Sequence, residues 1–345
     1  MASIDREQLL KSLESVTAGL STREIIEQSS CFVFTEGRVV TYNDMIACSQ
    51  STNMPNVGAI QAKRLLLLLQ KLPDDTIEVE TGEGKVKIKG KNRKAWIAAE
   101  KDILLPIDSI HMPKEWQKLH SDFLEALGMV QECAGKDETK PSSTFIHIHP
   151  EWIEAFDNYQ AARFYLPTGM SKPILVRQVS LKYIIGLGMT EWGLTKSWMH
   201  FRNSSGLTLS CRREIDEFFD LTKILQVKGE KTAFPKGLAD AVDRAEIFSS
   251  EDADNNQVTV KIDRGKVTVE GSGLTGGFSE VKKNSYSGNP YCFAISPTLL
   301  IEIIKKYSEC QITKNRLRVD GGKFQYVTTL NALSGKEKES EETDK

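Results

Sequence analysis

The chain has 345 residues, more than one hydrophobic core usually serves, so we expect two or three domains. Its composition, 40% apolar and 27% charged with a formal net charge of −2, is typical of a soluble globular protein and excludes a uniformly basic chain. No apolar run is long enough to cross a bilayer, and the N-terminal MASIDREQLL lacks the apolar core of a secretion signal, so we expect a cytoplasmic protein.

Helical periodicity appears at three evenly spaced places along the chain. Apolar residues recur at i, i+3, i+4 and i+7 from about Asp5, from about Ser121 and from Gly237. A second helix is predicted behind each, starting at Gly58, Ile174 and Ile295. The last of these begins with Ser296 and Pro297, a capping residue followed by a proline suited to the first turn.

Strand pairs with alternating β-branched residues follow every helix. Examples are CFVFTEGRVVTY in the first third, TFIHIHPEWIEAF in the second and VTVKIDRGKVTVEG in the last. The pattern of helix, strands, helix, strands therefore repeats three times, with a period too long for a solenoid. We predict three similar α+β domains over residues 1–115, 116–232 and 233–332, followed by a disordered charged tail over residues 333–345.

The residues with catalytic or metal-binding chemistry form no recognisable site. The six cysteines are scattered without a CxxC pair and lie in or beside apolar segments, so we predict reduced, buried thiols. His147 and His149 share one strand face, a spacing that can hold zinc, but no third ligand lies at a suitable spacing. The glycine-rich runs lack a phosphate-binding loop. We therefore expect no catalysis, no metal and no cofactor.

The repeats resemble one known family over nearly the whole chain. The matching segments are AVDRAEIFSSE with VTVKIDRGKVTVEG in the last domain, LQKLPDDTIEVETGEGKVKIKGKNRKAWI in the first, and the late strand FQYVTTL. Together they resemble the bacterial DNA polymerase III beta subunit, the sliding clamp. The resemblance implies three clamp domains per chain, each with two helices on antiparallel sheets, and a homodimeric six-domain ring around duplex DNA. It also implies a role in DNA replication as a processivity factor.

In this family the helices line the hole and face the DNA phosphates. The second helices have basic residues opposite their apolar faces, whereas the first helices have few. An exposed lysine is as easily an ordinary solvated residue, and Arg23 is as easily a surface arginine at a helix end. The resemblance implies DNA-facing roles for Lys11, Arg23, Lys63, Arg64, Lys71, Arg177, Lys182, Arg244, Lys305 and Lys306.

The resemblance also implies two protein interfaces. The ring would close where the first domain of one chain meets the third domain of another, through Arg93, Trp96, Ile247 and Phe248. A pocket for short apolar motifs of DNA polymerase and clamp-loader subunits would involve Ala162, Phe164, Phe219, Lys223, Ile224, Tyr326, Val327 and Thr329. Trp96 and Phe248 could also be core residues, but aromatic enrichment at interfaces favours the seam for both. Inter-domain packing explains each pocket residue equally simply.

The chain departs from the family pattern at this pocket. DNYQAAR stands where a Thr-Asp-Gly-His-Arg segment is common, and an acidic tail follows the last strand. These departures favour a phage- or plasmid-encoded clamp with a partner motif of its own. The alternative function is a monomeric clamp-like scaffold for DNA or partner proteins that never closes a ring. A more remote one is a metal-dependent hydrolase that uses His147 and His149.

Overall fold

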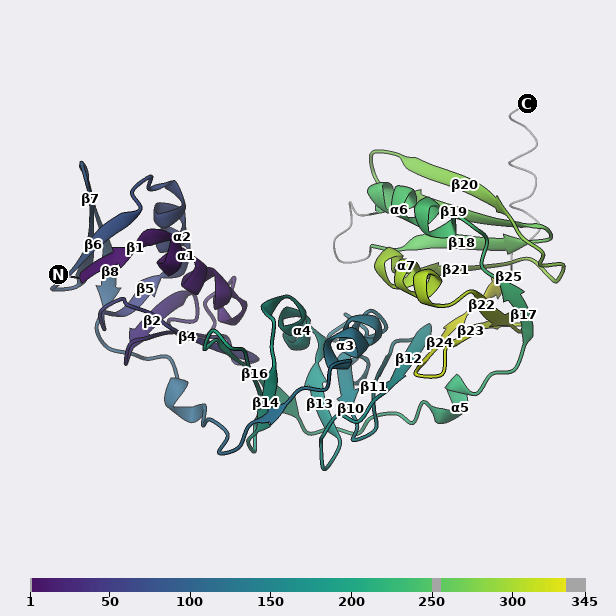
Figure 1. The fold of residues 1–345 in the computed structure, drawn as a ribbon, viewed down its shortest axis with the longest axis horizontal. Coiled ribbons are helices and arrows are strands. Elements are labelled where there is room, and N and C mark those ends of the chain that lie inside the picture. The colour runs from purple at the N-terminus through teal and green to yellow at the C-terminus, as the bar shows by residue number, and fades with distance from the viewer. Residues whose placement is uncertain (1, 250–255, 333–345) are drawn as a thin grey trace. The chain divides into compact units, whose positions relative to one another are not determined.

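The computed structural model of the protein describes residues 2–249 and 256–332, and the chain divides into two compact units (Figure 1). The first unit comprises Met1–Ser121 and Val179–Ile215, and the second comprises Asp122–Gln178 and Asp216–Lys345. Residues of the predicted second domain thus belong to both units, and the three predicted domain boundaries stay a prediction. The tail predicted over residues 333–345 lies outside the described residues.

The first unit contains two antiparallel sheets. The smaller sheet has the order β1 (Ala2–Asp5), β6 (Thr76–Gly82), β7 (Lys85–Gly90) and β8 (Arg93–Glu100). The larger sheet has the order β9 (Gln117–Lys118), β14 (Glu191–Leu194), β15 (Trp198–Arg202), β16 (Thr208–Glu214), β4 (Ile46–Ser51), β3 (Arg38–Tyr42), β2 (Cys31–Thr35) and β5 (Gly58–Gln61).

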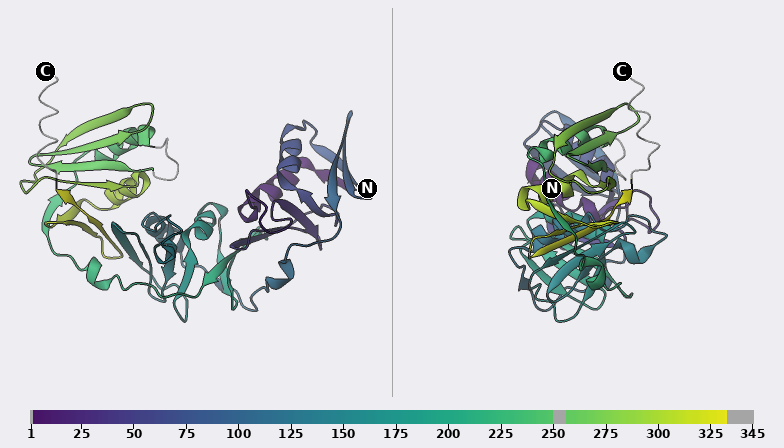
Figure 2. Two further views of the ribbon diagram at one scale, coloured as in Figure 1. Left: turned by 180° about the vertical axis from the view of Figure 1, so that it is seen from behind. Right: turned by 90° about the vertical axis from the view of Figure 1, so that its right-hand side faces the viewer.

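Two helices of the first unit, α1 (Arg6–Ser15) and α2 (Ala62–Lys71), lie side by side (Figures 1 and 2). Both are amphipathic, and the leucines Leu9, Leu13, Leu65 and Leu69 are buried. Asp5 caps α1 by accepting a hydrogen bond from the Gln8 amide at 2.7 Å. The shorter 3₁₀ segments of this unit are η1 (Thr17–Gly19), η2 (Ile107–Ser109) and η4 (Lys182–Leu187).

The second unit also contains two antiparallel sheets. Its larger sheet has the order β13 (Ile174–Arg177), β10 (Phe145–Ile148), β11 (Trp152–Phe156), β12 (Gln160–Tyr165), β24 (Phe324–Thr329), β23 (Arg316–Asp320), β22 (Glu309–Ile312) and β17 (Glu230–Ala233). Its smaller sheet has the order β20 (Gly277–Lys283), β19 (Lys266–Ser272), β18 (Val258–Asp263), β21 (Tyr291–Ile295) and β25 (Asn331–Ala332).

The helices of the second unit are α3 (Phe123–Gln131), α5 (Thr222–Leu225), α6 (Leu238–Ser249) and α7 (Pro297–Lys306), with η3 (Pro141–Thr144). Helices α6 and α7 pack against each other, and α6 covers β19 and β20 (Figure 1). The one-turn helix α4 (Gln178–Leu181) contains the point in the chain where the first unit resumes.

One strand pattern occurs three times. β2, β3 and β4 form a meander whose first strand also pairs with β5. β10 to β12 with β13, and β18 to β20 with β21, repeat this arrangement. The third strand of the first two meanders has a further partner, because β4 pairs with β16 and β12 with β24. The predicted repetition of similar α+β elements is therefore confirmed.

Two of the second helices begin later than predicted. Gly58–Gln61 and Ile174–Arg177 are strands, because these short apolar runs pair with β2 and β10 before any helix starts. The helix expected after Ile174 is reduced to α4 and η4. η4 ends at Gly188, whose backbone is in the left-handed region with φ 60°. Helix α7 begins where the Ser296-Pro297 signal predicts, and the Ser296 side chain caps it.

All six cysteines are free, as predicted, and all are buried except the partly exposed Cys292. Burial raises the pKa of the Cys48 thiol to about 12, so this residue behaves as an inert core residue. Within residues 2–249 and 256–332, no helix is long and apolar enough to cross a membrane.

Candidate DNA, subunit and partner interfaces

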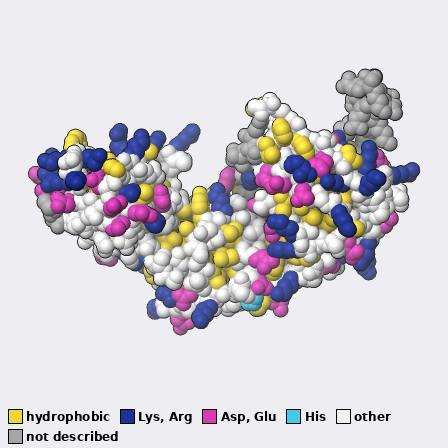
Figure 3. All heavy atoms as spheres, turned by 45° about the horizontal axis from the view of Figure 1, so that its top comes forward, with side chains coloured by type: hydrophobic (Ala, Val, Ile, Leu, Met, Phe, Trp, Pro, Cys, Tyr) yellow, Lys and Arg dark blue, Asp and Glu magenta, His cyan; other side chains and the backbone are white. Residues whose placement is uncertain are grey.

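Helix α2 exposes the predicted DNA-facing residues Lys63, Arg64 and Lys71, while Leu65 and Leu69 on the opposite side are buried. No ion pair involving these three cations is found in the described part of the chain. Their charge is therefore available to an external anion. In the view of Figure 3, Lys and Arg side chains gather over the N-terminal part of the chain.

The other predicted cations on helices are mostly paired with nearby carboxylates. These contacts are Lys11 to Glu7 at 2.8 Å, Arg244 to Glu280 at 2.7 Å, Lys305 to Glu302 at 3.3 Å and Lys306 to Glu125 at 2.6 Å. Lys11 lowers the pKa of Glu7, and Lys282 with Arg244 lowers that of Glu280. Exposed ion pairs of this kind contribute little stability, so phosphates can replace the carboxylates at small cost.

The three remaining predicted DNA-facing residues lie outside regular α-helix. Arg23 is exposed in the loop after η1. Lys182 is exposed in η4, with Nζ 5.1 Å from the centre of the Tyr183 ring. Arg177 is half-buried at the end of β13, where it pairs with Glu138 and lies over the Phe145 ring.

The first half of the predicted ring seam lies on β8. Trp96 is 70% exposed and stands opposite Lys87 on the outer face of the small sheet. Arg93 is exposed, with Nη1 3.3 Å from an oxygen of Asp74. One edge of β8 pairs with β7 from Lys85 to Gly90, but the other edge pairs with β5 only at Ala99 and Glu100. Among residues 2–249 and 256–332, the rest of that second edge has no strand partner.

The second half of the predicted seam lies on α6, which packs against β20. Ile247 is 66% exposed, and Phe248 is partly exposed with its ring stacked on Phe278 at 6.4 Å. Val281 and Leu274 add exposed apolar surface nearby in sequence. Within residues 256–332 and the rest of the described chain, β20 pairs only with β19, so its outer edge is unpaired. An aromatic and aliphatic surface beside an unpaired edge is suited to strand pairing with another chain.

Four of the predicted pocket residues are in the protein interior, Val327 among them. Ala162, Phe164 and Tyr326 are buried, and Ala162 lies opposite Tyr326 in the β12–β24 register. Alternate residues of a strand point to opposite faces, so the neighbouring Ala161 and Val327 face the other way. These two pack against Leu221 and Leu225 of the α5 segment. A direct peptide-contact role for Ala162, Phe164 and Tyr326 does not fit this arrangement.

The other predicted pocket residues surround α5. Phe219 is 56% exposed and contacts the Phe156 ring, while Lys223 is exposed. Ile224 packs on the cluster that contains Val327, and Thr329 is partly exposed at the end of β24. This side of the sheet offers an apolar floor with a cation at its margin. The predicted role in binding a partner peptide therefore fits this surface around α5.

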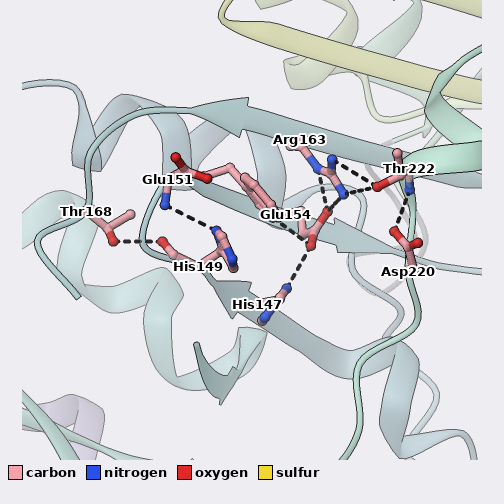
Figure 4. Close-up of polar contacts among 9 residues, drawn as sticks. His147, His149, Glu151, Glu154, Arg163, Thr168, Asp220 and Thr222 are labelled. Atoms are coloured by element: carbon pink, nitrogen blue, oxygen red, sulfur yellow. Dashed lines mark hydrogen bonds and ion pairs between the residues drawn. The ribbon is translucent and has the colours of Figure 1, made fainter. Parts of the chain in front are cut away.

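A buried polar network beneath this surface was missed from the sequence (Figure 4). Glu154 accepts hydrogen bonds from Arg163 at 2.7 Å and from the Trp152 indole at 2.8 Å, and it contacts His147 Nδ1 at 2.7 Å. Arg163 also reaches Thr222 at the start of α5. His147, Glu154 and Arg163 are register partners on β10, β11 and β12. Polar, ionisable residues within three apolar strands were the signal available in the sequence.

The two histidines considered as metal ligands have other contacts. His147 stacks on Phe218 at 4.6 Å, in addition to its bond with Glu154. His149 stacks on Trp152 at 3.5 Å, and its Nδ1 accepts a hydrogen bond from the Glu151 amide. Burial lowers the pKa of His149. In the part of the chain that the structure describes, no three metal-ligating side chains lie together.

Comparisons with known proteins agree on the fold. No protein-family model matches the chain, and no curated protein matches it significantly. Solved structures match over 96% of this chain and 99% of theirs. They include the DNA polymerase III beta chain of Streptococcus pneumoniae (16% identity, TM-score 0.73), the DNA polymerase sliding clamp of Bacillus subtilis (14%, 0.71) and the DNA polymerase III beta subunit of Thermotoga maritima (14%, 0.70). The chain has the fold of these clamps.

Proposed function

We propose that this protein is a DNA polymerase processivity factor, a sliding clamp that closes as a homodimeric ring around duplex DNA. The clamp fold supports this, since the solved structures that share it are named as DNA polymerase III beta subunits or sliding clamps. The proposal includes no catalysis by the chain. Its contribution is to hold a polymerase on the DNA without making or breaking a bond.

The observation that carries the proposal is a pair of strand edges, on β8 and β20, that are largely unpaired within the described residues. The final strand of the β15–β16 hairpin pairs with the third strand of the first meander, β4. The final strand of β23–β24 pairs in the same way with β12 of the second meander. β8 ends the β7–β8 hairpin, as β16 and β24 end theirs, and β20 ends the third meander, as β4 and β12 end the first two. Within the described residues β8 and β20 are not paired with each other.

Pairing β8 of one copy with β20 of another would form a third pair of the same kind as β16–β4 and β24–β12. The two edges differ, so the contact is head-to-tail, and such a contact makes a ring when its rotation closes. It would join Trp96 of one chain to the Ile247 and Phe248 surface of the next. Two copies would then supply the repeated elements around the DNA, with the cations of α2 among those facing the phosphates.

The α5 surface is the proposed docking place for polymerase and clamp-loader segments. Phe219 and Ile224 would provide apolar contacts above the buried Val327, and Lys223 would pair with an acidic group of the partner. Arg163 would support this surface by holding Thr222, and thereby α5, against the sheet.

Ring closure is tested by the solution mass and by retention on DNA. We expect light scattering to give twice 38.6 kDa over a dilution series, and we expect loaded protein to remain on nicked circular DNA and to leave when the DNA is linearised. Trp96→Glu and Ile247→Glu should each give a monomer that is not retained. Tyr159→Glu, which alters an equally exposed aromatic residue elsewhere, should leave the dimer intact. A wild-type monomer that binds DNA without topological retention would instead support the open scaffold.

A further inference from the structure

A cavity of about 170 Å³ lies in the first unit, between the sheet and the chain segment that follows β8. Its floor is formed by β3, β4 and β16, through Val40, Ser49 and Thr208 among others. Ile107, Ile110 and Met112 of the covering segment form the opposite wall. An apolar cavity of about 150 Å³ holds a benzene-sized molecule, so this one has room for a single aliphatic or small aromatic side chain.

The cavity occupies the same place in the repeat as the α5 surface of the second unit. Ala47 is the register partner of Ser210 in the β4–β16 pair, and Ala161 is that of Val327 in the β12–β24 pair. A connecting segment covers each strand pair. In the second unit Leu221 and Leu225 of α5 pack directly on Ala161 and Val327. In the first unit the segment has no α-helix there, and a hydroxyl of Ser210 replaces the larger Val327, which leaves the space open.

Arg38 gives this cavity a cation. Its Nε donates to Ser49 Oγ at 2.6 Å, and its Nη2 donates to the Ser49 and Gly206 carbonyls at 3.3 and 3.4 Å. Arg38 is partly buried, and that burial lowers its pKa. No ion pair of Arg38 is found among residues 2–249 and 256–332. A guanidinium held in this way presents its remaining N–H groups to a ligand.

The acidic residues at the cavity lie at its margin. Glu36 and Asp108 both border it, and both are exposed to water, where their charges are solvated and screened. The hydroxyl-bearing residues Thr35, Thr208 and Ser210 also line the cavity. The interior therefore combines apolar contacts, neutral hydroxyl groups and one positive charge.

We propose that this cavity is a second docking site, which takes a short segment of a partner protein that inserts one aliphatic side chain beside a carboxylate paired with Arg38. The site goes beyond the proposed clamp function, because the docking of polymerase and clamp-loader segments proposed there uses only the α5 surface. Each chain would thus offer two docking places of similar construction and different specificity. The cavity would select an acidic neighbour through Arg38, whereas the α5 surface would combine Lys223 with its aromatic margin at Phe219.

Peptide selection on the full-length protein tests this proposal. Random octapeptides displayed on phage are selected on the wild-type protein, with soluble Thr208→Trp protein present as competitor. Thr208→Trp fills the cavity from the floor, and Met112→Trp fills it from the covering segment, so the result does not depend on one variant. Ser204→Trp places the same side chain on an exposed turn outside the cavity and serves as the control. Melting curves establish that each variant is folded.

We expect the selected peptides to share an aliphatic residue next to Asp or Glu. Their affinity, measured by fluorescence anisotropy, should fall at least tenfold with Thr208→Trp and Met112→Trp, and about tenfold with Arg38→Gln. Ser204→Trp should leave it unchanged. Phe219→Ser should also leave it unchanged, which separates this site from the proposed α5 surface. The proposal fails if no peptide is enriched over the competitor, or if the enriched peptides bind both tryptophan-filled variants as tightly as the wild type.

Discussion

His200 is a buried histidine kept neutral by its surroundings. It is fully buried on β15, with Nδ1 2.7 Å from the Ser210 hydroxyl and Nε2 3.2 Å from that of Thr195. Burial lowers its pKa to about 4, because the charged imidazolium would lose its hydration. In the unfolded chain an ordinary histidine has a pKa near 6.5, so the two states bind protons differently.

This difference predicts a loss of stability in mild acid. Between about pH 6.5 and pH 4 the unfolded chain binds a proton that the native His200 does not, so stability falls as the pH falls. The loss of unfolding free energy from this group should reach about 3 kcal/mol below pH 4. His200→Gln should remove this part of the pH dependence in urea titrations, whereas the exposed His111→Gln should retain it. If the unfolding free energy of wild type and His200→Gln depended on pH with the same slope, the pH dependence could not be assigned to His200.

The pair of Glu154 and Arg163 predicts a strong effect of a single change. Arg163→Met would leave the carboxylate of Glu154 buried without its guanidinium partner, and the unfolding free energy should fall by about 3 kcal/mol. Adding Glu154→Gln should recover part of the loss. Lys231→Met, which breaks an exposed pair with Glu309, should cost far less, because water screens that pair. Similar losses for the buried and the exposed pair would show that the network is not a stabilising unit.

At the scale of elements, α6 lies unusually close to β19 at Gly271. A Cβ atom added to Gly271 would be 1.9 Å from the carbonyl oxygen of Ala245 in α6. Gly277 on the neighbouring strand has room, since its added Cβ would be 3.4 Å from its nearest neighbour. The absence of a side chain at Gly271 therefore sets how closely the helix carrying the proposed seam packs on the sheet.

Gly271→Ala should move α6 and lower the unfolding free energy by about 1–3 kcal/mol, the usual cost of overpacking. Gly277→Ala should change it little. Chemical denaturation of both variants measures the difference, and dimer mass measured in parallel shows whether the displaced helix also weakens the seam. Equal stability of the two variants would mean that α6 adjusts without cost.

At the scale of the whole molecule, the proposed DNA interaction should be electrostatic and independent of sequence. Lys63→Glu with Arg64→Glu should weaken binding to linear duplex DNA and reduce the slope of log K against log salt by about 0.9 for each phosphate that the variant no longer neutralises. Lys228→Glu with Lys314→Glu makes the same change in charge on loops outside the predicted DNA-facing set. An equal effect of the two pairs would mean that α2 has no special part in DNA binding.

The sequence by itself determined the repeated elements. Helical and strand periodicities depend on neighbours within a few residues, so α1, α7 and hairpins such as β2–β3 could be predicted directly from the residues. The fold followed from their order and from the resemblance to sliding clamps. Local patterns were less informative where an apolar run suited either a helix or a strand, as at Gly58 and Ile174. Both residues begin strands, because β2 and β10 lie beside these runs and pair with them.

Only the tertiary structure decided which faces and edges are free. The sequence placed Ala162 and Tyr326 in the partner pocket, but the strand partners turn them inward and turn Ala161 and Val327 toward α5. It likewise gave no sign that Arg38 would line a cavity. Burial at these positions is set by segments more than a hundred residues away in the chain. Periodicity cannot predict such contacts, because it reflects only the alternation of side chains within one strand.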